Sequence, residues 1–84
     1  MTSIDYSKLR SLTARELISA LIKEDFSFDR QTGSHQQYCH PDGRRVTVSF
    51  HHPRDTFSTR TLKSMIEKQA KWSEADPKRL NLLK

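Results

Sequence analysis

The chain has 84 residues, of which 33% are hydrophobic and 30% are charged, and its formal net charge is +5 at pH 7. This length predicts one small domain, and the single cysteine excludes an intramolecular disulfide and favours a reducing compartment. Because the sequence has neither a signal-peptide pattern at its start nor an apolar run near the ~20 residues of a membrane span, we expect a cytoplasmic protein with no membrane segment.

The N-terminal part of the chain predicts a leader followed by one amphipathic helix. Residues 1–12 are expected to form a loose leader, in which the leucines at positions 9 and 12 are able to pack. Thr13 and Glu16 then have the spacing of a capping box, in which each side chain bonds the backbone N–H of the other residue. Apolar residues recur behind them at helical spacing, so we predict a helix over about residues 14–24.

Three strands are predicted in the middle of the chain. Alternating apolar and polar residues at positions 26–30 favour a half-buried strand, which ends in a turn at Gln31–Gly33. His40–Gly43 then combines Pro and Asp, which suit the central positions of a type I turn, with a Gly that closes the turn by a bulge. This turn pairs His40 with Arg44 and predicts an antiparallel hairpin.

The register of the hairpin sorts its side chains onto two faces, because successive residues of a strand point to opposite sides. The face predicted to lie in the core carries Tyr38, Val46, Val48 and Phe50. The face predicted to be open to solvent carries His35, Gln37, Cys39, Arg45, Thr47 and Ser49. His35 is therefore expected on the open side of the sheet.

A second helix and a short C-terminal helix are predicted after the hairpin. Leu62, Met65 and Ile66 have helical spacing, and Asp55, Ser58 or Thr59 is a suitable cap. A further capping-box pattern at residues 73–76 precedes two leucines that give the last segment an apolar edge. The expected fold is therefore α+β with the order α-β-β-β-α, in which two helices cover one face of a three-stranded antiparallel sheet and a short C-terminal helical extension follows.

The positive charge is concentrated in two parts of the sequence. Residues 1–28 carry four basic and four acidic side chains, residues 29–54 carry four basic and two acidic, and residues 55–84 carry seven basic and four acidic. A basic half on a small domain favours nucleic acid as a partner, although an excess of this size also serves solubility alone.

A metal site is the first function to consider for the segment 32–52, which holds all four histidines and the only cysteine. Zinc holds its ligands at about 2 Å. The register separates Cys39 and His40 from His51 and His52 by roughly 16 Å, at ~3.3 Å per strand residue. One site from these four residues is excluded by that register, and we predict no metal.

Nucleophilic catalysis by Cys39 is the second possibility. The residue lies beside the turn, and no helix N-terminus is near it in sequence to stabilise a thiolate. We therefore interpret Cys39 as a small half-buried residue.

Acid–base chemistry by His35 is the third possibility. Histidine can take and give a proton at neutral pH, and Gly33 and Ser34 before it allow close approach of a phosphate backbone and offer a hydroxyl. The arginines predicted to hold phosphates are Arg44, Arg45 and Arg54, and Arg45 is expected on the open face beside His35. This set suits metal-free RNA cleavage, in which the 2′-OH attacks its own phosphate, while the alternative is a solvated surface histidine without a role.

Several stretches of the sequence resemble the HicA family of toxin proteins, also called the YcfA-like domain. They are Gly33-Ser34-His35, the run from His40 to Val48 (HPDGRRVTV), His51, and the run from Thr61 to Ala70. The resemblance divides the chain into an N-terminal leader (1–12), a HicA-like domain (13–70) and a C-terminal helical extension (71–84). Relatives often carry a second histidine where this chain has Gln36, but this difference does not affect the proposed proton-transfer group.

The resemblance implies a fold, an activity and a partner. The fold is that of a double-stranded-RNA-binding domain, and the activity is that of an mRNA interferase, an endoribonuclease that needs no cofactor and in which His35 is the catalytic residue. The partner is a HicB-type antitoxin protein, and DNA is contacted only indirectly, through the antitoxin complex. Two alternatives remain open: a module or decayed toxin that binds RNA without cutting it, and an interaction protein whose basic surface meets an acidic partner.

Overall fold

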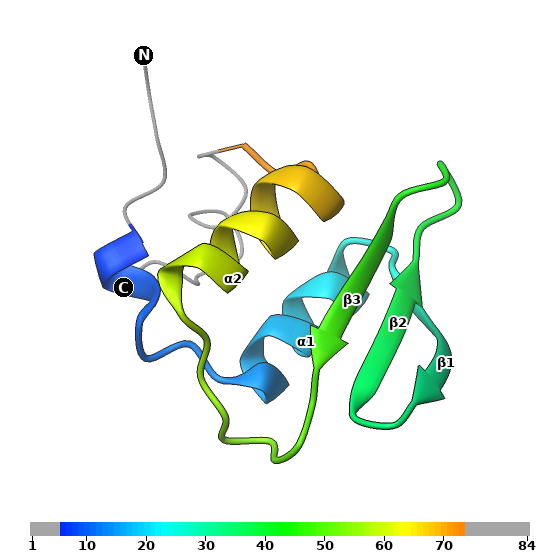
Figure 1. The fold of residues 1–84 in the computed structure, drawn as a ribbon. Coiled ribbons are helices and arrows are strands. Elements are labelled where there is room, and N and C mark those ends of the chain that lie inside the picture. The colour runs from blue at the N-terminus through cyan, green and yellow to red at the C-terminus, as the bar shows by residue number, and fades with distance from the viewer. Residues whose placement is uncertain (1–5, 74–84) are drawn as a thin grey trace.

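The structure is a computed structural model and describes residues 6–73 (Figure 1). It confirms the predicted α-β-β-β-α order, and the predicted C-terminal helix lies outside the described residues. A short 3-10 helix precedes the fold, and a π-helical segment continues α2. The elements are η1 (Tyr6–Leu9), α1 (Ala14–Lys23), β1 (Ser27–Thr32), β2 (His35–Cys39), β3 (Arg45–Ser49), α2 (Thr59–Lys63) and η2 (Ser64–Gln69).

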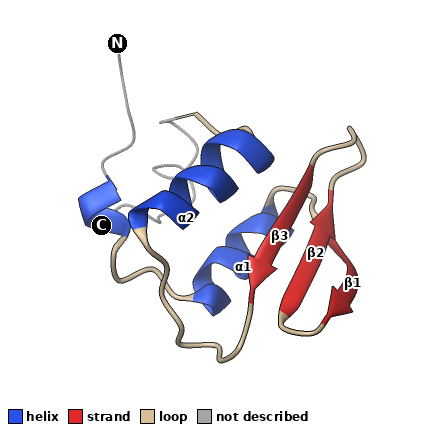
Figure 2. Cartoon of the chain, in the orientation of Figure 1, coloured by secondary structure: helices blue, strands red, loops and turns tan. Residues whose placement is uncertain are grey.

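The three strands form one antiparallel sheet in the order β1-β2-β3, with the helices on one side of it (Figure 2). The predicted hairpin register is confirmed, because Tyr38 pairs with Val46 and His35 pairs with Ser49. The turn is closed by a hydrogen bond of 2.9 Å from the His40 N–H to the Arg44 carbonyl, and Gly43 has a φ of +99°. That left-handed conformation is the reason for a glycine at this position.

The strand β1 differs from expectation in two ways. It continues to Thr32, which pairs with His35, so the turn consists of Gly33 and Ser34 and does not include Gln31. A bulge between Phe28 and Arg30 also breaks its alternation, and all six residues of the strand are exposed. Phe28 is 55% exposed, because β1 is an edge strand that the helices do not cover.

The core lies between the two helices and the face of the sheet that carries Tyr38, Val46 and Val48, as predicted. Phe50, which was predicted on the same face, follows the end of β3, is only half-buried and lies outside this cluster. The predicted capping box at the start of α1 is also present, since Thr13 Oγ1 accepts from the Glu16 N–H at 3.2 Å and Glu16 Oε1 accepts from the Thr13 N–H at 3.0 Å. Of the three candidate caps for α2, Ser58 is the one used. The remaining buried side chains of the core cluster are Tyr6, Leu9, Leu12, Leu17, Ala20, Leu21, Phe26, Leu62, Met65, Ile66, Ala70 and Trp72.

The outer edge of β3 is closed by a side chain of η2. The backbone N–H of Thr47 donates to Gln69 Oε1 at 2.8 Å, and Gln69 Nε2 donates to Ser64 Oγ at 3.0 Å. The amide of Gln69 therefore takes the place of a neighbouring strand at this position.

The second half of the expected loose leader is packed into the core. Leu9 is fully buried and Leu12 nearly so, and the Tyr6 hydroxyl donates a hydrogen bond to Glu67. A 3-10 helix repeats every three residues, so Tyr6 and Leu9 project from the same side of η1. The segment lies beside the start of α2 (Figure 1).

Replacing Leu9 by alanine tests whether this segment stabilises the fold. The variant is expected to lose about 2–5 kcal/mol of the free energy of unfolding, because a fully buried leucine leaves a cavity when it is truncated. Ile22→Ala is the control, since Ile22 is 57% exposed and should cost about 0.5 kcal/mol or less. Urea unfolding measures both, and equal values would mean that the N-terminal segment does not contribute to the core.

Candidate active site

His35 is the first residue of β2 and lies on the open face of the sheet, where it is exposed. Its neighbours across the sheet are Thr32 on β1 and Ser49 on β3. Within residues 6–73, no hydrogen bond or ion pair engages its imidazole. The ring nitrogens are therefore accessible to a substrate and able to transfer a proton to or from it.

The turn that precedes His35 is held at both of its carbonyl groups. Gly33, with a φ of +59°, occupies the first position of the two-residue turn, as a type II′ hairpin requires. Its carbonyl accepts from Gln31 Nε2 at 2.9 Å, and the Ser34 carbonyl accepts from the Phe50 N–H at 2.6 Å. The backbone that carries His35 is thereby tied to β1 and to the segment after β3.

A chain of side-chain hydrogen bonds connects this turn to the core. The Tyr38 hydroxyl donates to Gln36 Oε1 at 2.7 Å, and Gln36 Nε2 donates to Gln31 Oε1 at 3.3 Å. Burial raises the pKa of Tyr38, so its hydroxyl remains a donor at neutral pH. The sequence did not predict that these glutamines hold the turn.

Arg45 lies on the same face as His35 but nearer the other end of the sheet. Cys39, the partner of Arg45, is four positions after His35 along β2, which is roughly 13 Å at ~3.3 Å per residue. The Nη1 atom of Arg45 donates to Gln37 Oε1 at 2.7 Å and to Asp29 Oδ2 at 3.0 Å. Arg45 is therefore not beside His35, and its guanidinium extends over the middle of the open face.

The carboxylate of Asp29 holds two guanidinium groups on this face. It accepts from Arg45 and also from Arg30 Nε at 3.2 Å. The hydrogen bond from Arg45, followed by the one from Arg30, lowers the pKa of Asp29. Two arginines against one carboxylate leave a net positive charge on the open face.

Arg44 occupies a structural position at the turn of the hairpin. Its guanidinium donates to Asp42 Oδ2 at 2.8 Å and to the Ala70 carbonyl at 2.6 Å, and it lies 5.1 Å from the centre of the Phe26 ring. These contacts tie the turn to the end of η2. A phosphate contact by Arg44 stays a prediction, and the site of that contact would be at the end of the sheet opposite His35.

Arg54 lies in the loop that leaves β3 at the end of the sheet where His35 is found. This loop begins at Phe50, which bonds Ser34, and Arg54 is exposed, with no side-chain partner within the described residues. His52 shapes the loop, since its Nδ1 accepts from the Arg54 N–H at 3.1 Å. The structure thus brings Gly33, Ser34 and His35 close to the loop of Arg54.

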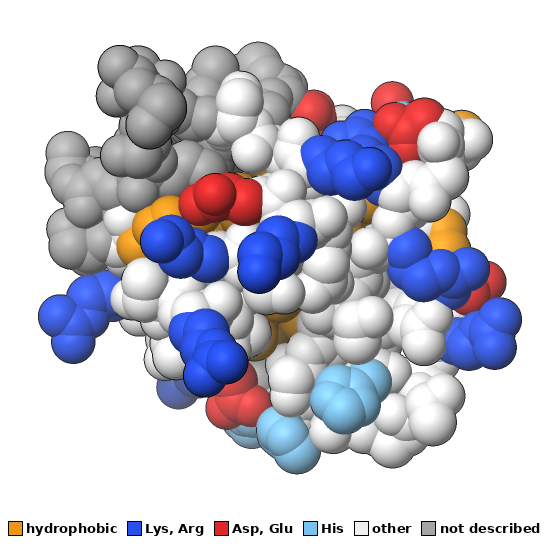
Figure 3. All heavy atoms as spheres, turned by 45° about the horizontal axis from the view of Figure 1, so that its top comes forward, with side chains coloured by type: hydrophobic (Ala, Val, Ile, Leu, Met, Phe, Trp, Pro, Cys, Tyr) orange, Lys and Arg blue, Asp and Glu red, His pale blue; other side chains and the backbone are white. Residues whose placement is uncertain are grey.

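One face of the molecule carries both histidine and basic side chains (Figure 3). Histidine side chains lie at one edge of the face shown there, and lysine and arginine side chains are spread over the rest of it, with fewer acidic side chains between them. A polyanion that reaches the histidines would therefore also meet positive charge.

The other reactive side chains of the segment 32–52 are placed apart. Within residues 6–73, no three His, Cys, Asp or Glu side chains lie close enough to hold a metal ion together. His40 is packed edge-on against Phe26, with 5.0 Å between the ring centres, and its Nδ1 lies 2.9 Å from Asp42 Oδ1. Cys39 is half-buried at the end of β2.

Replacing Arg45 by alanine tests the electrostatics of the open face. The pKa of Asp29 is expected to rise toward its ordinary value of 3.8 because its largest stabilising contact is lost. A lowered pKa stabilises the folded protein above the unfolded-state pKa, and this contribution disappears as the pH falls through the folded-state pKa. The variant should therefore lose less stability between neutral pH and pH 3 than the unmodified chain.

NMR titration of the carboxyl carbons measures this effect directly. Asp42 is the internal control, since its pKa is lowered mainly by the backbone N–H of Arg44 and should not respond to the loss of Arg45. An unchanged titration of Asp29 in the variant would contradict the contact between Asp29 and Arg45.

Comparison with known proteins identifies the family. The family described as "HicA toxin of bacterial toxin-antitoxin" matches residues 14–72, which is more than half of the chain. A comparison with curated proteins gave no match. Among the described residues there is no helix that is both long and apolar enough to span a bilayer. The motif around His35, the hairpin and the second helix all lie inside the matched region, and the chain belongs to the HicA toxin family of bacterial toxin–antitoxin systems.

Proposed function

We propose that this toxin is a metal-independent endoribonuclease that cuts mRNA and uses His35 as a general acid or base. The observation that carries the proposal is the position of His35. Its imidazole is exposed and unengaged within the described residues, and it follows a turn whose two carbonyls are both hydrogen-bonded. A rigid support with a free acid–base group suits proton transfer to a bound substrate.

The reaction is transesterification followed by release of two RNA ends. The 2′-oxygen attacks the adjacent phosphorus, an O2′–P bond forms and the P–O5′ bond breaks, which leaves a 2′,3′-cyclic phosphate and a 5′-hydroxyl. One proton leaves the 2′-OH and one is added to the departing 5′-oxygen. His35 transfers one of these two protons, and solvent transfers the other.

The basic groups bind the RNA on both sides of the scissile bond. Gly33 and Ser34 allow the backbone to approach His35, and Arg54 lies in the loop at the same end of the sheet. Arg45 is about 13 Å away along the strands and therefore binds a neighbouring phosphate. Arg44, which is engaged with Asp42 and Ala70, contributes charge at the far end.

The fold class indicates the kind of RNA recognition. Domains of the double-stranded-RNA-binding type read shape and backbone more than base sequence, and we infer weak sequence selectivity with cleavage at single-stranded linkages. The antitoxin is of the HicB type and covers the face that carries His35, and DNA is reached only through that complex. The site of action is the cytoplasm, where mRNA is translated.

The test is cleavage of a labelled single-stranded RNA by the purified full-length chain in the presence of EDTA. The expected result is cutting with 2′,3′-cyclic phosphate ends, and no cutting of the DNA oligonucleotide of the same sequence, which lacks the 2′-OH. Cutting of both, or cutting that EDTA abolishes, would contradict the mechanism.

A module that binds RNA without cutting it is the second candidate. One observation favours it: no carboxylate or carbonyl within residues 6–73 is hydrogen-bonded to His35 to orient its ring, as a catalytic histidine often requires. Retained binding of RNA together with no cleavage in EDTA or in Mg²⁺ would support this candidate.

A further inference from the structure

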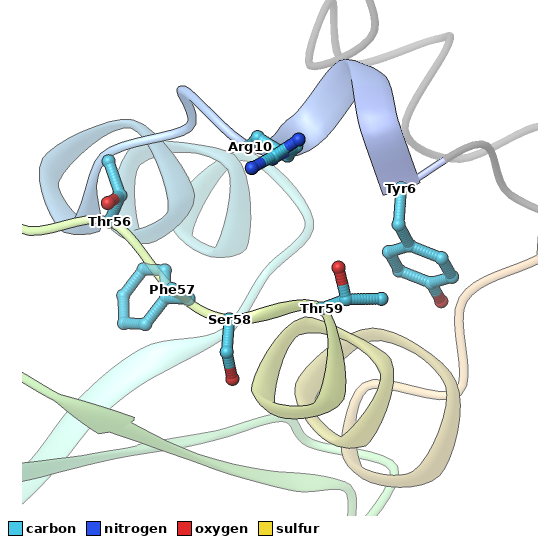
Figure 4. Close-up of a pocket in the computed structure, with 6 residues that line it drawn as sticks. All are labelled: Tyr6, Arg10, Thr56, Phe57, Ser58 and Thr59. Atoms are coloured by element: carbon cyan, nitrogen blue, oxygen red, sulfur yellow. The ribbon is translucent and has the colours of Figure 1, made fainter.

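A hollow of about 560 Å³ lies between η1 and the beginning of α2, away from the open face of the sheet (Figure 4). One side is formed by Tyr6 and Arg10 and the other by the segment from Thr56 to Thr59. Tyr6 and Arg10 lie outside the region that matches the HicA family, so this chain's own N-terminal segment completes the hollow.

The polar groups of the hollow are available to a ligand. The Arg10 side chain is exposed, and no hydrogen bond or ion pair engages it among the described residues. The hydroxyls of Thr56 and Thr59 are likewise unengaged there, whereas Ser58 Oγ is occupied by the N–H of Thr61. In Figure 4 the Arg10 guanidinium faces the Thr56–Thr59 segment across the hollow. One guanidinium opposite two hydroxyls suits a phosphate and the sugar next to it.

Two aromatic rings stand at opposite ends of the hollow (Figure 4). Phe57 is half-buried and packs against the core. Tyr6 is held by the core and by its hydrogen bond to Glu67, and burial, followed by the contact with that carboxylate, raises its pKa far above the ordinary value. Phe57 therefore keeps an exposed part on which a nucleobase can stack, whereas Tyr6 is buried and closes the other end of the hollow.

We propose that this hollow binds one nucleotide of a single-stranded RNA. The phosphate lies beside Arg10, the hydroxyls of Thr56 and Thr59 contact the phosphate or the sugar next to it, and the base stacks on Phe57. The volume is within the ~300–1,000 Å³ of ordinary ligand sites. An acidic peptide would use the guanidinium but would leave the exposed part of the Phe57 ring without a partner.

The inference rests on the proposed function, because it takes RNA as the substrate. The loop from Phe50 to Ser58 connects the two sites: it begins at the residue that bonds Ser34 and ends at the cap of α2. An RNA strand that follows this loop would be bound at His35 and again in the hollow.

The experiment measures RNA binding in the full-length His35→Ala chain, which prevents cutting. An eight-nucleotide RNA is titrated while the backbone amides are observed by NMR, and its dissociation constant is measured at several salt concentrations. Arg10→Ala is compared with Lys23→Ala, which removes an equal charge from an exposed position at the end of α1, outside the hollow. A parallel titration uses AMP.

The expected result is that RNA shifts the amides from Thr56 to Thr59, and that Arg10→Ala removes these shifts but not those near Ser34. Arg10→Ala should weaken binding about tenfold and lower the salt slope by about 0.7, the value for one phosphate contact on a single strand. Lys23→Ala should weaken binding less than twofold. AMP should shift the same amides only at much higher concentration.

Three outcomes would overturn the inference. Equal dissociation constants for the two variants, with the Thr56–Thr59 amides unmoved, would exclude the hollow from RNA binding even if His35-dependent cutting is observed. AMP binding as tight as RNA binding would make a free nucleotide the ligand. No RNA binding by any variant would overturn it too. RNA binding in the hollow by an unmodified chain that cuts no RNA would instead support the hollow as an RNA site and contradict the proposed nuclease activity.

Discussion

The His35→Ala variant is expected to cut RNA about 10²–10⁴-fold more slowly than the unmodified chain, which is the usual contribution of a general acid or base. The side chain is exposed, so its removal should not change the fold. RNA binding should be nearly unchanged, because affinity for a polyanion comes from phosphate contacts with arginine and lysine. The loss should therefore appear in kcat and not in the dissociation constant.

Two further variants separate proton transfer from other effects of the substitution. His35→Gln keeps a polar side chain at the position but cannot transfer a proton, so it should be as slow as His35→Ala. His51→Ala removes an exposed histidine from the segment that follows β3 and should cut at the normal rate. Single-turnover cleavage with saturating enzyme measures the rate of the chemical step, and a binding titration at one salt concentration measures the dissociation constant of the RNA. Normal cleavage by His35→Ala would assign the chemistry to another group or to a contaminant.

Phe26→Ala is expected to have the largest effect on stability, a loss of about 3–5 kcal/mol of the free energy of unfolding. The ring is only 2% exposed, and it meets His40 and Trp72 edge-on with 5.0 and 6.4 Å between ring centres. The Arg44 guanidinium covers it as well. Truncation would therefore leave a cavity and also loosen the contact between the hairpin turn and the end of η2.

Phe28→Ala is the matched control for this variant. Phe28 is two residues further along, is 55% exposed, and makes one edge-on ring contact with Tyr38 at 5.8 Å. Its loss should cost roughly 1 kcal/mol, the size of one aromatic pair on a sheet. Chemical denaturation of both variants measures the difference. Similar values would show that β1 packs differently from the structure described above.

Local sequence chemistry predicted much of the fold. The capping box at Thr13 and Glu16 fixed the start of α1. The turn from His40 to Gly43 determined the register of the hairpin, because a shift by one residue would move every side chain to the other face. Where a few neighbouring residues specify a turn or a cap, the sequence pattern is therefore sufficient to predict the start of a helix or the register of a hairpin.

The differences arose where distant segments decide the structure. The alternation at 26–30 predicted a regular half-buried strand, but β1 is an uncovered edge with a bulge. The leader was expected to be loose, with Leu9 and Leu12 able to pack, but no local pattern shows that Tyr6 and Leu9 find a space beside α2. Both outcomes depend on which surfaces remain uncovered after the other elements have packed.

The candidate site was only partly predicted, because it also depends on contacts between distant segments. The hairpin register placed His35 and Arg45 on the open face, and the structure agrees, but they are separated by about 13 Å. Gln31 and Gln36 hold the turn through a contact between β1 and β2. The sequence did not predict this contact, because Gln31 was placed in the turn and not in the strand. The engagement of Arg44 with Ala70 joins residues 26 positions apart.

The amide of Gln69 at the edge of β3 has a consequence for self-association. An open strand edge is a template on which another chain can add a strand and begin aggregation. At β3 the N–H of Thr47 is already occupied by Gln69, and at the opposite edge the bulge between Phe28 and Arg30 interrupts the regular spacing of backbone groups. Each edge of the described sheet thus carries a feature that interrupts its extension, and we expect strand pairing with a second copy to be disfavoured at both.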